Sequence, residues 1–335
     1  MAGREAGVSE MHEAIRAIVE RPAAEGATHA LCVGHRGRVV HEWYGPGLGP
    51  DSTLISWSVA KSITHALVGI AVGDGLLDPS ASELFPEWAD DERSTITLDD
   101  LLKMRSGLEW VEDYVDGDVS DVIAMLFGNS PHDGDHAGYA IDKPLVHRPG
   151  AHWLYSSGTT NIITKVLSRA LGEQEGESRA IRAFVDDRLF GPLGMSSATI
   201  KCDATGNFVG SSYVYATARD YVRFAELYRN DGCTATARIL PVGWVDGARE
   251  STVLDPDMQM SYGRQWWGWP DDADSLVAHG YRGQIVWVSP HRDLTVVHLG
   301  QTEAAHTANL RRLVADLVET CPPTGASIGN DGGNG

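Results

Sequence analysis

The sequence predicts an α/β fold of the α+β type, in which an antiparallel sheet is flanked by helices and carries a helical insertion. Strand-like runs lie near both ends of the 335-residue chain, and segments with helical spacing fill its middle. We therefore expect residues 1–57 and 205–322 to form one discontinuous sheet domain, and residues 58–204 to form a mainly helical domain. Residues 323–335 are rich in glycine and asparagine, which is typical of a disordered tail.

The N-terminal elements are predicted to be a helix and a hairpin. Apolar residues recur at helical spacing in residues 11–21, which indicates a surface helix. Segments 29–33 and 38–43 are typical of strands, and the glycine-containing turn at 34–37 joins them into a hairpin.

A buried helix is expected next, at residues 58–72, because apolar residues occupy nearly every face of it. Helical spacing also runs from residue 97 to about residue 171, with a polar loop between residues 128 and 138. The remaining strands and the last helix are expected at 208–215, 276–288, 294–299 and 302–320.

Composition limits the classes of partner. Lysine and arginine number 27 against 46 aspartate and glutamate, giving a formal charge of −19. Such a chain repels nucleic acids and anionic membranes, so we expect no nucleic-acid partner and no membrane partner. The four cysteines are widely spaced and form no C-x-x-C pair, which excludes a zinc ribbon and gives no disulfide framework. The first twenty residues lack the apolar stretch of a secretory signal, so a cytoplasmic location is expected.

A serine and a lysine lie at the start of the predicted buried helix, in the S-x-x-K segment 58–61. Residues three apart share a helix face, so the Lys61 amine can reach the Ser58 oxygen. Burial disfavours the ammonium form, which leaves an amine able to accept the serine proton. The helix N-terminus also favours negative charge developing at Ser58. The alternative is a capping serine next to a lysine whose charge reaches solvent.

Two further segments carry candidate chemistry. Tyr155 follows a proline–glycine turn signal, and a buried tyrosine near a lysine can act as a phenolate base; the alternative is a core aromatic residue. His279, Gly280 and Tyr281 precede an apolar strand. Glycine beside a strand lets a substrate approach the backbone closely, as an oxyanion site requires, although an ordinary hairpin turn would look similar.

Other motifs are interpreted structurally. Ser120 and Asp121 precede an apolar run and read as a helix N-cap. The two histidines of segment 132–136 fall in a loop, so no metal site is expected there. The G-x-S-x-G match at 325–329 lacks the flanking strand and helix of a nucleophile elbow. Trp267 lies in a tryptophan-rich segment that fits either the core or the wall of an apolar substrate pocket.

Together, the S-x-x-K segment, the Tyr155 motif and segment 279–284 resemble the serine β-lactamase and penicillin-recognising hydrolase superfamily. The likeness runs from about residue 28 to residue 320. It is closest to the branch that contains class C β-lactamases, family VIII esterases and 6-aminohexanoate-dimer (nylon oligomer) hydrolases. Further matching segments are 101–108, 189–195, 217–220 and 240–244. The resemblance implies the β-lactamase/transpeptidase-like fold.

The resemblance also implies roles for individual residues. Ser58 would be the acyl-forming nucleophile, Lys61 its proton partner and Tyr155 the general base. The backbone N–H groups of Ser58 and Tyr281 would form the oxyanion hole. Candidate substrate-binding residues are Tyr114, in a segment similar to a substrate-contacting loop of the nylon oligomer enzymes, together with His279 and Trp267.

Two departures from the family pattern bear on the substrate. The serine pair 156–157 follows Tyr155 where class C enzymes have Tyr-x-Asn, and His279 stands in the region of the expected Lys-Thr-Gly motif. That lysine helps to hold the carboxylate of a β-lactam or a D-alanyl peptide. β-Lactams are therefore expected to be poor substrates, unless Arg282 or His279 takes its place.

The function expected from the sequence is serine hydrolysis of carboxylic esters or small linear amides, with 6-aminohexanoate oligomers as the most specific candidate. The partner would be a small-molecule ester or amide, and we expect no cofactor and no metal. The sequence leaves the oligomeric state open, with a homodimer as one candidate. The alternatives are a β-lactamase or D-alanyl-D-alanine peptidase, and a non-catalytic scaffold that resembles penicillin-binding proteins.

Overall fold

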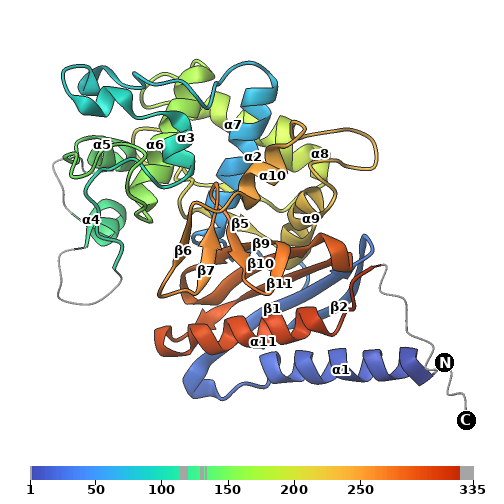
Figure 1. Cartoon of the computed structure of the whole chain (residues 1–335). Helices are drawn as coiled ribbons and strands as arrows, with labels where there is room; N and C mark the ends of the chain where they lie inside the picture. Colours follow the sequence, from blue (N-terminus) through green and yellow to red (C-terminus); the bar gives the residue numbers. More distant parts are fainter. Residues whose placement is uncertain (1, 114–119, 129–131, 133, 325–335) are drawn as a thin grey trace, which may run out of the picture.

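The structure is a computed structural model, and it describes residues 2–113, 120–128, 132 and 134–324. An eight-stranded antiparallel sheet lies at its centre (Figure 1). Across the sheet, the strands are β2 (Arg38–Tyr44), β1 (Gly26–His35), β11 (Leu294–Thr302), β10 (Gln284–Ser289), β9 (Asp272–Gly280), β8 (Trp267–Trp269), β7 (Met260–Tyr262) and β6 (Val253–Asp255). Because β1 pairs with β11, strands from near the two ends of the sequence lie side by side in one sheet.

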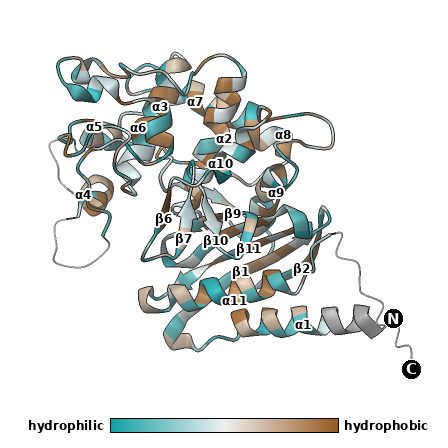
Figure 2. Ribbon diagram, in the orientation of Figure 1, coloured by the Kyte–Doolittle hydropathy of each residue, from teal (hydrophilic) through white to brown (hydrophobic). Residues whose placement is uncertain are grey.

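Helices cover both faces of this sheet (Figure 1). The helices α1 (Ala2–Val19) and α11 (Thr307–Glu319) lie side by side on one face, while α2 (Val59–Gly73) and α9 (Ala218–Arg229) pack on the other. Each face encloses its own cluster of buried apolar residues. In Figure 2 the central strands are mainly brown, whereas α11 alternates between brown and teal, as expected for a helix with one buried face.

Most of the remaining helices pack beyond α2 and away from the large sheet, whereas α10 (Trp244–Arg249) contacts β9 (Figure 1). The others are α3 (Leu98–Leu102), α4 (Asp121–Phe127), α5 (His136–Ile141), α6 (Ser157–Ala170), α7 (Arg179–Val185) and α8 (Gly191–Leu193). A small three-stranded sheet consists of β3 (Leu54–Ile55), β5 (Val214–Ala216) and β4 (Thr199–Ile200), in that order. In the sequence, β3 precedes α3, and β4 and β5 follow α8. None of the helices in the described ranges is long and apolar enough to cross a membrane.

The helix α2 is buried along almost its whole length, as the sequence predicts, and every residue from Val59 to Ala71 is inaccessible or nearly so. Gly69 is needed within it, because a Cβ atom there would lie 2.4 Å from Nε1 of Trp244. This close packing against α10 fixes the helix, and with it the residues at its N-terminus.

Several predicted elements differ from those observed. Of the strand expected at 208–215, only residues from Val214 onwards are in β5, because earlier carbonyl groups bond to helix side chains instead of to a strand. Thr164 donates to the Phe208 carbonyl at 2.7 Å, and Thr64 donates to the Gly210 carbonyl at 3.1 Å.

Further elements that were not predicted include the helix α9 and the short strands β6, β7 and β8, each of only three residues. The helical stretch expected over 97–171 is divided into short helices, of which α6 begins only at Ser157. The last helix begins at Thr307, since residues up to Thr302 belong to β11.

Candidate active site

Ser58 directly precedes α2, and its side chain does not cap the helix. Its backbone has φ −64° and ψ −5°, and no capping hydrogen bond is made. Its Oγ instead accepts a hydrogen bond from Nζ of Lys61 at 2.9 Å. The preceding residue, Trp57, has φ +45°, a left-handed conformation that is costly for a bulky side chain and is found at functional sites. The structure therefore contradicts the capping alternative and leaves the Ser58 hydroxyl available for chemistry.

Lys61 is buried, with 2% of its surface exposed, so its charge does not reach solvent. Besides Ser58, its Nζ donates to Oγ of Ser157 at 3.0 Å and to the carbonyl oxygen of Ser211 at 3.2 Å. Burial lowers the pKa of Lys61 to about 8, although the nearby Glu112 carboxylate opposes this shift. A lysine with this pKa exists partly as the neutral amine near neutral pH.

Tyr155 and Ser58 line the same pocket, and the side chain of Ser58 opposes the rise in the pKa of Tyr155. Nζ of Lys61 lies 4.8 Å from the centre of the Tyr155 ring, and Trp267 stacks on this ring at 5.6 Å. Burial, together with the charge of Glu112, raises the pKa of Tyr155 well above its ordinary value. The structure thus places Tyr155 where the sequence predicts it, but burial disfavours the phenolate form expected there.

Glu112 extends this arrangement, and sequence reasoning did not select it as a site residue. Its carboxylate accepts hydrogen bonds from the backbone N–H of Ser157 at 2.8 Å and from the Ser157 hydroxyl at 2.5 Å. Because Ser157 also accepts from Lys61, a continuous chain of hydrogen bonds joins Ser58 to Glu112. The one signal in the sequence was the second serine of the tyrosine motif, which stands where class C enzymes have asparagine.

The end of β9 approaches the N-terminus of α2 closely. A Cβ atom on Gly280 would lie 2.6 Å from the Ser56 carbonyl oxygen and 3.2 Å from the Ser58 nitrogen, so only glycine allows this approach. The next residue, Tyr281, packs its ring edge-on against Trp57 at 5.4 Å. The backbone of Tyr281 is therefore brought to the same end of the site as Ser58.

These residues open into a pocket of about 300 Å³. Its lining residues are Ser58, Glu112, Tyr155, Asp255, Asp257, Met258, Trp267, His279 and Tyr281. His279 and Trp267 thus line the pocket, whereas Tyr114 lies outside the described residues.

Neither residue named as a replacement for the missing lysine is an evident one. Burial lowers the pKa of His279 to about 3, with the charge of Arg311 contributing, so its ring is neutral near pH 7. The Arg282 guanidinium lies over the Tyr281 ring, 5.6 Å from its centre.

The other motifs have structural roles or lie outside the described residues. Ser120 caps α4 by accepting a hydrogen bond from the N–H of Ile123, as predicted. In segment 132–136, Asp135 caps α5, and within the described ranges no group of three or more histidine, cysteine or acidic residues could hold a metal ion. The G-x-S-x-G match at 325–329 lies outside the described residues.

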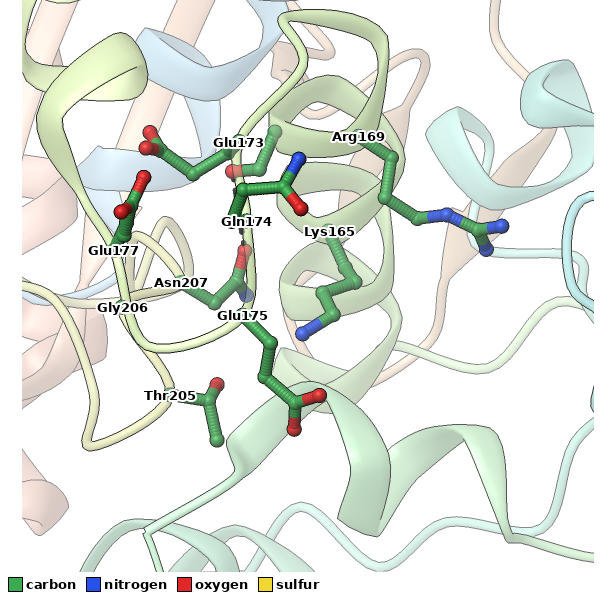
Figure 3. Close-up of a pocket in the computed structure, with 10 residues that line it drawn as sticks. Lys165, Arg169, Glu173, Gln174, Glu175, Glu177, Thr205, Gly206 and Asn207 are labelled. Carbon is green, nitrogen blue, oxygen red and sulfur yellow. Dashed lines mark hydrogen bonds between the residues drawn. The ribbon is translucent and has the colours of Figure 1, made fainter.

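A second cavity, of about 200 Å³, lies between α6 and the segments 173–177 and 205–207 (Figure 3). Lys165 faces it from α6, whereas the Arg169 side chain extends away to the Leu84 carbonyl, and glutamates from the neighbouring loop also line it. None of the residues that line it belongs to the pocket at Ser58.

Almost the whole chain matches one known protein family. The sequence model of the family described as "Beta-lactamase" matches residues 12–319. The chain belongs to this family. Its architecture is accordingly the β-lactamase/transpeptidase-like fold, and the protein is a hydrolase of the beta-lactamase family.

Individual relatives support this assignment. The chain is 28% identical over 318 residues to a 6-aminohexanoate-dimer hydrolase of Paenarthrobacter ureafaciens, covering 90% of this chain and 79% of that protein. A Bacillus anthracis structure named as a candidate 6-aminohexanoate-dimer hydrolase superposes with a TM-score of 0.73 at 22% identity, covering 89% of this chain and 81% of that one. A family VIII carboxylesterase superposes with a TM-score of 0.70 at 13% identity, covering 94% and 96%. At these identities, the two structures show a shared fold.

Proposed function

We propose that this beta-lactamase-family hydrolase forms an acyl-enzyme at Ser58 and cleaves carboxylic esters or small linear amides. The observation that carries the proposal is the contact between Ser58 Oγ and the buried amine of Lys61, at 2.9 Å, beside an open pocket. A scaffold that only binds ligands has no need for a buried lysine with a lowered pKa next to a hydroxyl group.

In acylation, Oγ of Ser58 bonds to the substrate carbonyl carbon, and its proton passes to the neutral Lys61 amine. The negative charge on the carbonyl oxygen is held by the N–H groups of Ser58 and Tyr281. The bond to the leaving group then breaks, and the leaving group takes up a proton through the hydroxyl group of Tyr155. The proton lost by Ser58 therefore departs with the alcohol or the amine.

Deacylation reverses these roles. A water molecule in the pocket loses a proton to the same groups as its oxygen bonds to the acyl carbon. The ester bond to Ser58 breaks, Ser58 regains its proton, and the carboxylic acid product leaves. We assign proton acceptance to Lys61 and relay to the neutral Tyr155, because burial raises the pKa of the tyrosine and lowers that of the lysine.

The substrate assignment rests on similarity and on a missing charge. The relative at 28% identity is named for 6-aminohexanoate-dimer hydrolysis, which makes a linear amide of this type the first candidate. His279 is neutral and replaces the lysine that holds the carboxylate of β-lactams in the family. We therefore propose esters and linear amides in preference to β-lactams or D-alanyl peptides.

The decisive test labels the protein with a fluorophosphonate and measures the intact mass. Wild type should gain one adduct and hydrolyse short nitrophenyl esters, whereas Ser58→Ala should do neither, with activity at least about 10⁴-fold lower. Ser62→Ala, one turn further along the same buried helix, is the matched control and should still be labelled. Labelling that persists in Ser58→Ala would refute the proposed nucleophile.

A further inference from the structure

The turn between β9 and β10 carries the proposed oxyanion donor and adopts an uncommon backbone conformation. Arg282 has φ +59° and ψ +29°, and Gly283 has φ +83°. A left-handed conformation costs a residue with a side chain about 1 kcal/mol or more, so the surrounding structure must hold it. Two carbonyl groups of this turn, those of Tyr281 and Gly283, bond to buried side chains from the neighbouring strands.

Gln284, the first residue of β10, holds the turn from one side. Its side chain is 2% exposed. Its Nε2 donates to the Tyr281 carbonyl at 2.9 Å and to the Gly300 carbonyl at 2.7 Å, while its Oε1 accepts from the Gly300 N–H at 2.9 Å. Both amide hydrogens and the carbonyl oxygen of the side chain are therefore used, which fixes its orientation.

His298 holds the turn from β11. Its ring is fully buried, its Nδ1 lies 2.7 Å from the Gly283 carbonyl, and its Nε2 lies 3.0 Å from the Thr28 hydroxyl. A carbonyl oxygen can only accept, so Nδ1 carries the hydrogen. Burial lowers the pKa of His298 to about 3, so the ring is neutral and this tautomer is fixed.

These contacts define the orientation of the Tyr281 N–H. The backbone of Gln284 is paired with Gly280 across the two strands, and its side chain holds the Tyr281 carbonyl. Gln284 thus lies opposite the residue before Tyr281 in the strand register and donates a hydrogen bond to the peptide group after it. An oxyanion donor acts only if it points to the place where charge develops, so loss of this tie should reduce the rate of the chemical step.

We propose that Gln284 is a positioning residue that fixes the Tyr281 N–H in the oxyanion hole, with His298 supporting the same turn. This inference rests on the proposed function, since it assumes that Tyr281 stabilises the oxyanion formed at Ser58. Gln284 does not line the pocket, so it acts through the turn and not by contact with substrate.

The test compares two glutamines. Gln265 is also 2% exposed, and its side chain likewise donates to a carbonyl, that of Leu102 at 2.9 Å, and accepts from a hydroxyl, that of Thr160 at 2.9 Å. Methionine has the length of glutamine but neither amide donors nor the carbonyl oxygen. Gln284→Met and Gln265→Met therefore remove the same buried hydrogen-bonding group, but only the first releases the oxyanion turn.

Hydrolysis of a nitrophenyl ester and inhibition by a boronic acid are measured for both variants. Gln284→Met should lower kcat about 10- to 100-fold with little change in KM, and should weaken the boronic acid, which mimics the tetrahedral intermediate, by a similar factor. Gln265→Met should change both by less than about threefold when corrected for the folded fraction. Equal loss in the two variants, or boronic acid affinity unchanged in Gln284→Met, would overturn the proposal.

A second variant covers the case in which Gln284→Met fails to fold. In Gln284→Glu the carboxylate form cannot donate to Tyr281, but the protonated form can. Activity relative to wild type should therefore rise as the pH falls from 8 to 5.5, and a constant ratio would contradict the proposal. Wild type without Ser58-dependent hydrolysis would instead refute the proposed function, so the two failures are distinct.

Discussion

A glutamate lines both the pocket at Ser58 and the cavity beside α6 (Figure 3), and a lysine contacts Ser58 in the first and lines the second, yet only the first has the arrangement of a catalytic centre. Lys61 is buried and donates three hydrogen bonds, whereas Lys165 is half-buried and has no hydrogen-bond partner among the described residues. Glu112 bonds to Ser157 in the chain of hydrogen bonds that leads to Ser58. Glu173 instead accepts from N–H groups at the start of α7, which is a structural role.

This difference shows which property of a cavity indicates chemistry. Charged residues line both cavities, so charge alone does not distinguish them. What distinguishes the site at Ser58 is that its lysine, Lys61, is removed from water and joined by a hydrogen bond to a hydroxyl group. Removal from water is what lowers the pKa of Lys61, and a lowered pKa is what makes a lysine a base near neutral pH.

The largest expected effect on activity comes from a comparison in which Lys61 and Lys165 are each replaced by methionine. Lys61→Met should lower kcat/KM for an ester by about 10³-fold or more, since it removes the proton acceptor for Ser58. Lys165→Met should leave kcat/KM within about twofold of wild type. Steady-state kinetics on both purified variants check this. Equal effects would remove the distinction drawn between the two cavities.

A smaller effect on kcat/KM is expected when Glu112 and Glu173 are each replaced by glutamine. In the proposed mechanism the neutral Lys61 accepts the proton of Ser58, so kcat/KM of wild type should rise about tenfold per pH unit below pH 8 and level off above it. The Glu112 charge opposes the lowering of that pKa, so Glu112→Gln should move the midpoint of the profile to lower pH and reduce the plateau about 10-fold. Glu173→Gln should leave the midpoint unchanged. A midpoint that stays fixed in Glu112→Gln would contradict the coupling.

The smallest effect concerns stability and tests buried groups outside both cavities. His65 and His298 are fully buried, and burial lowers the pKa of each to about 3. Unfolding restores an ordinary pKa near 6.5, so below that pH the unfolded chain binds more protons than the folded chain. The stability of the folded state is therefore undiminished by these histidines above pH 6.5, and it decreases as the pH falls towards 3.

Urea unfolding at pH 7.5 and pH 5.5 measures this loss. The free energy of unfolding should fall by about 1 kcal/mol for each histidine at the lower pH. A protein that is equally stable at both values would mean that these rings are not held neutral, and would weaken the structural account of the oxyanion turn.

Much of the fold followed from local sequence patterns. The buried helix α2 and the strands β1, β2 and β11 carry strong apolar signals, and the structure confirms them. The three-residue strands β6 to β8 are too short to show a period, and they exist because neighbouring strands pair with them.

The site was predictable only in part. Ser58, Lys61 and Tyr155 lie in recognisable motifs, and the structure brings them together. Glu112 was missed because its importance comes from the path of its loop, which places the carboxylate on Ser157. The disfavoured phenolate has a similar cause, since the degree of burial of Tyr155 depends on rings from β7 and β8 that are distant in sequence.

The pairing of the first large strand with the last has a consequence for the order of folding. In the large sheet, Ala30 lies opposite Leu299, so one edge of β1 is paired only when two strands that are far apart in the sequence come together. Contacts between such distant residues form slowly, and the hairpin of β1 and β2 has an unpaired edge until they do. The turn that brings Tyr281 to Ser58 likewise belongs to the last part of the chain. A chain truncated before β11 would therefore lack both the strand that pairs with β1 and the His298 contact to this turn.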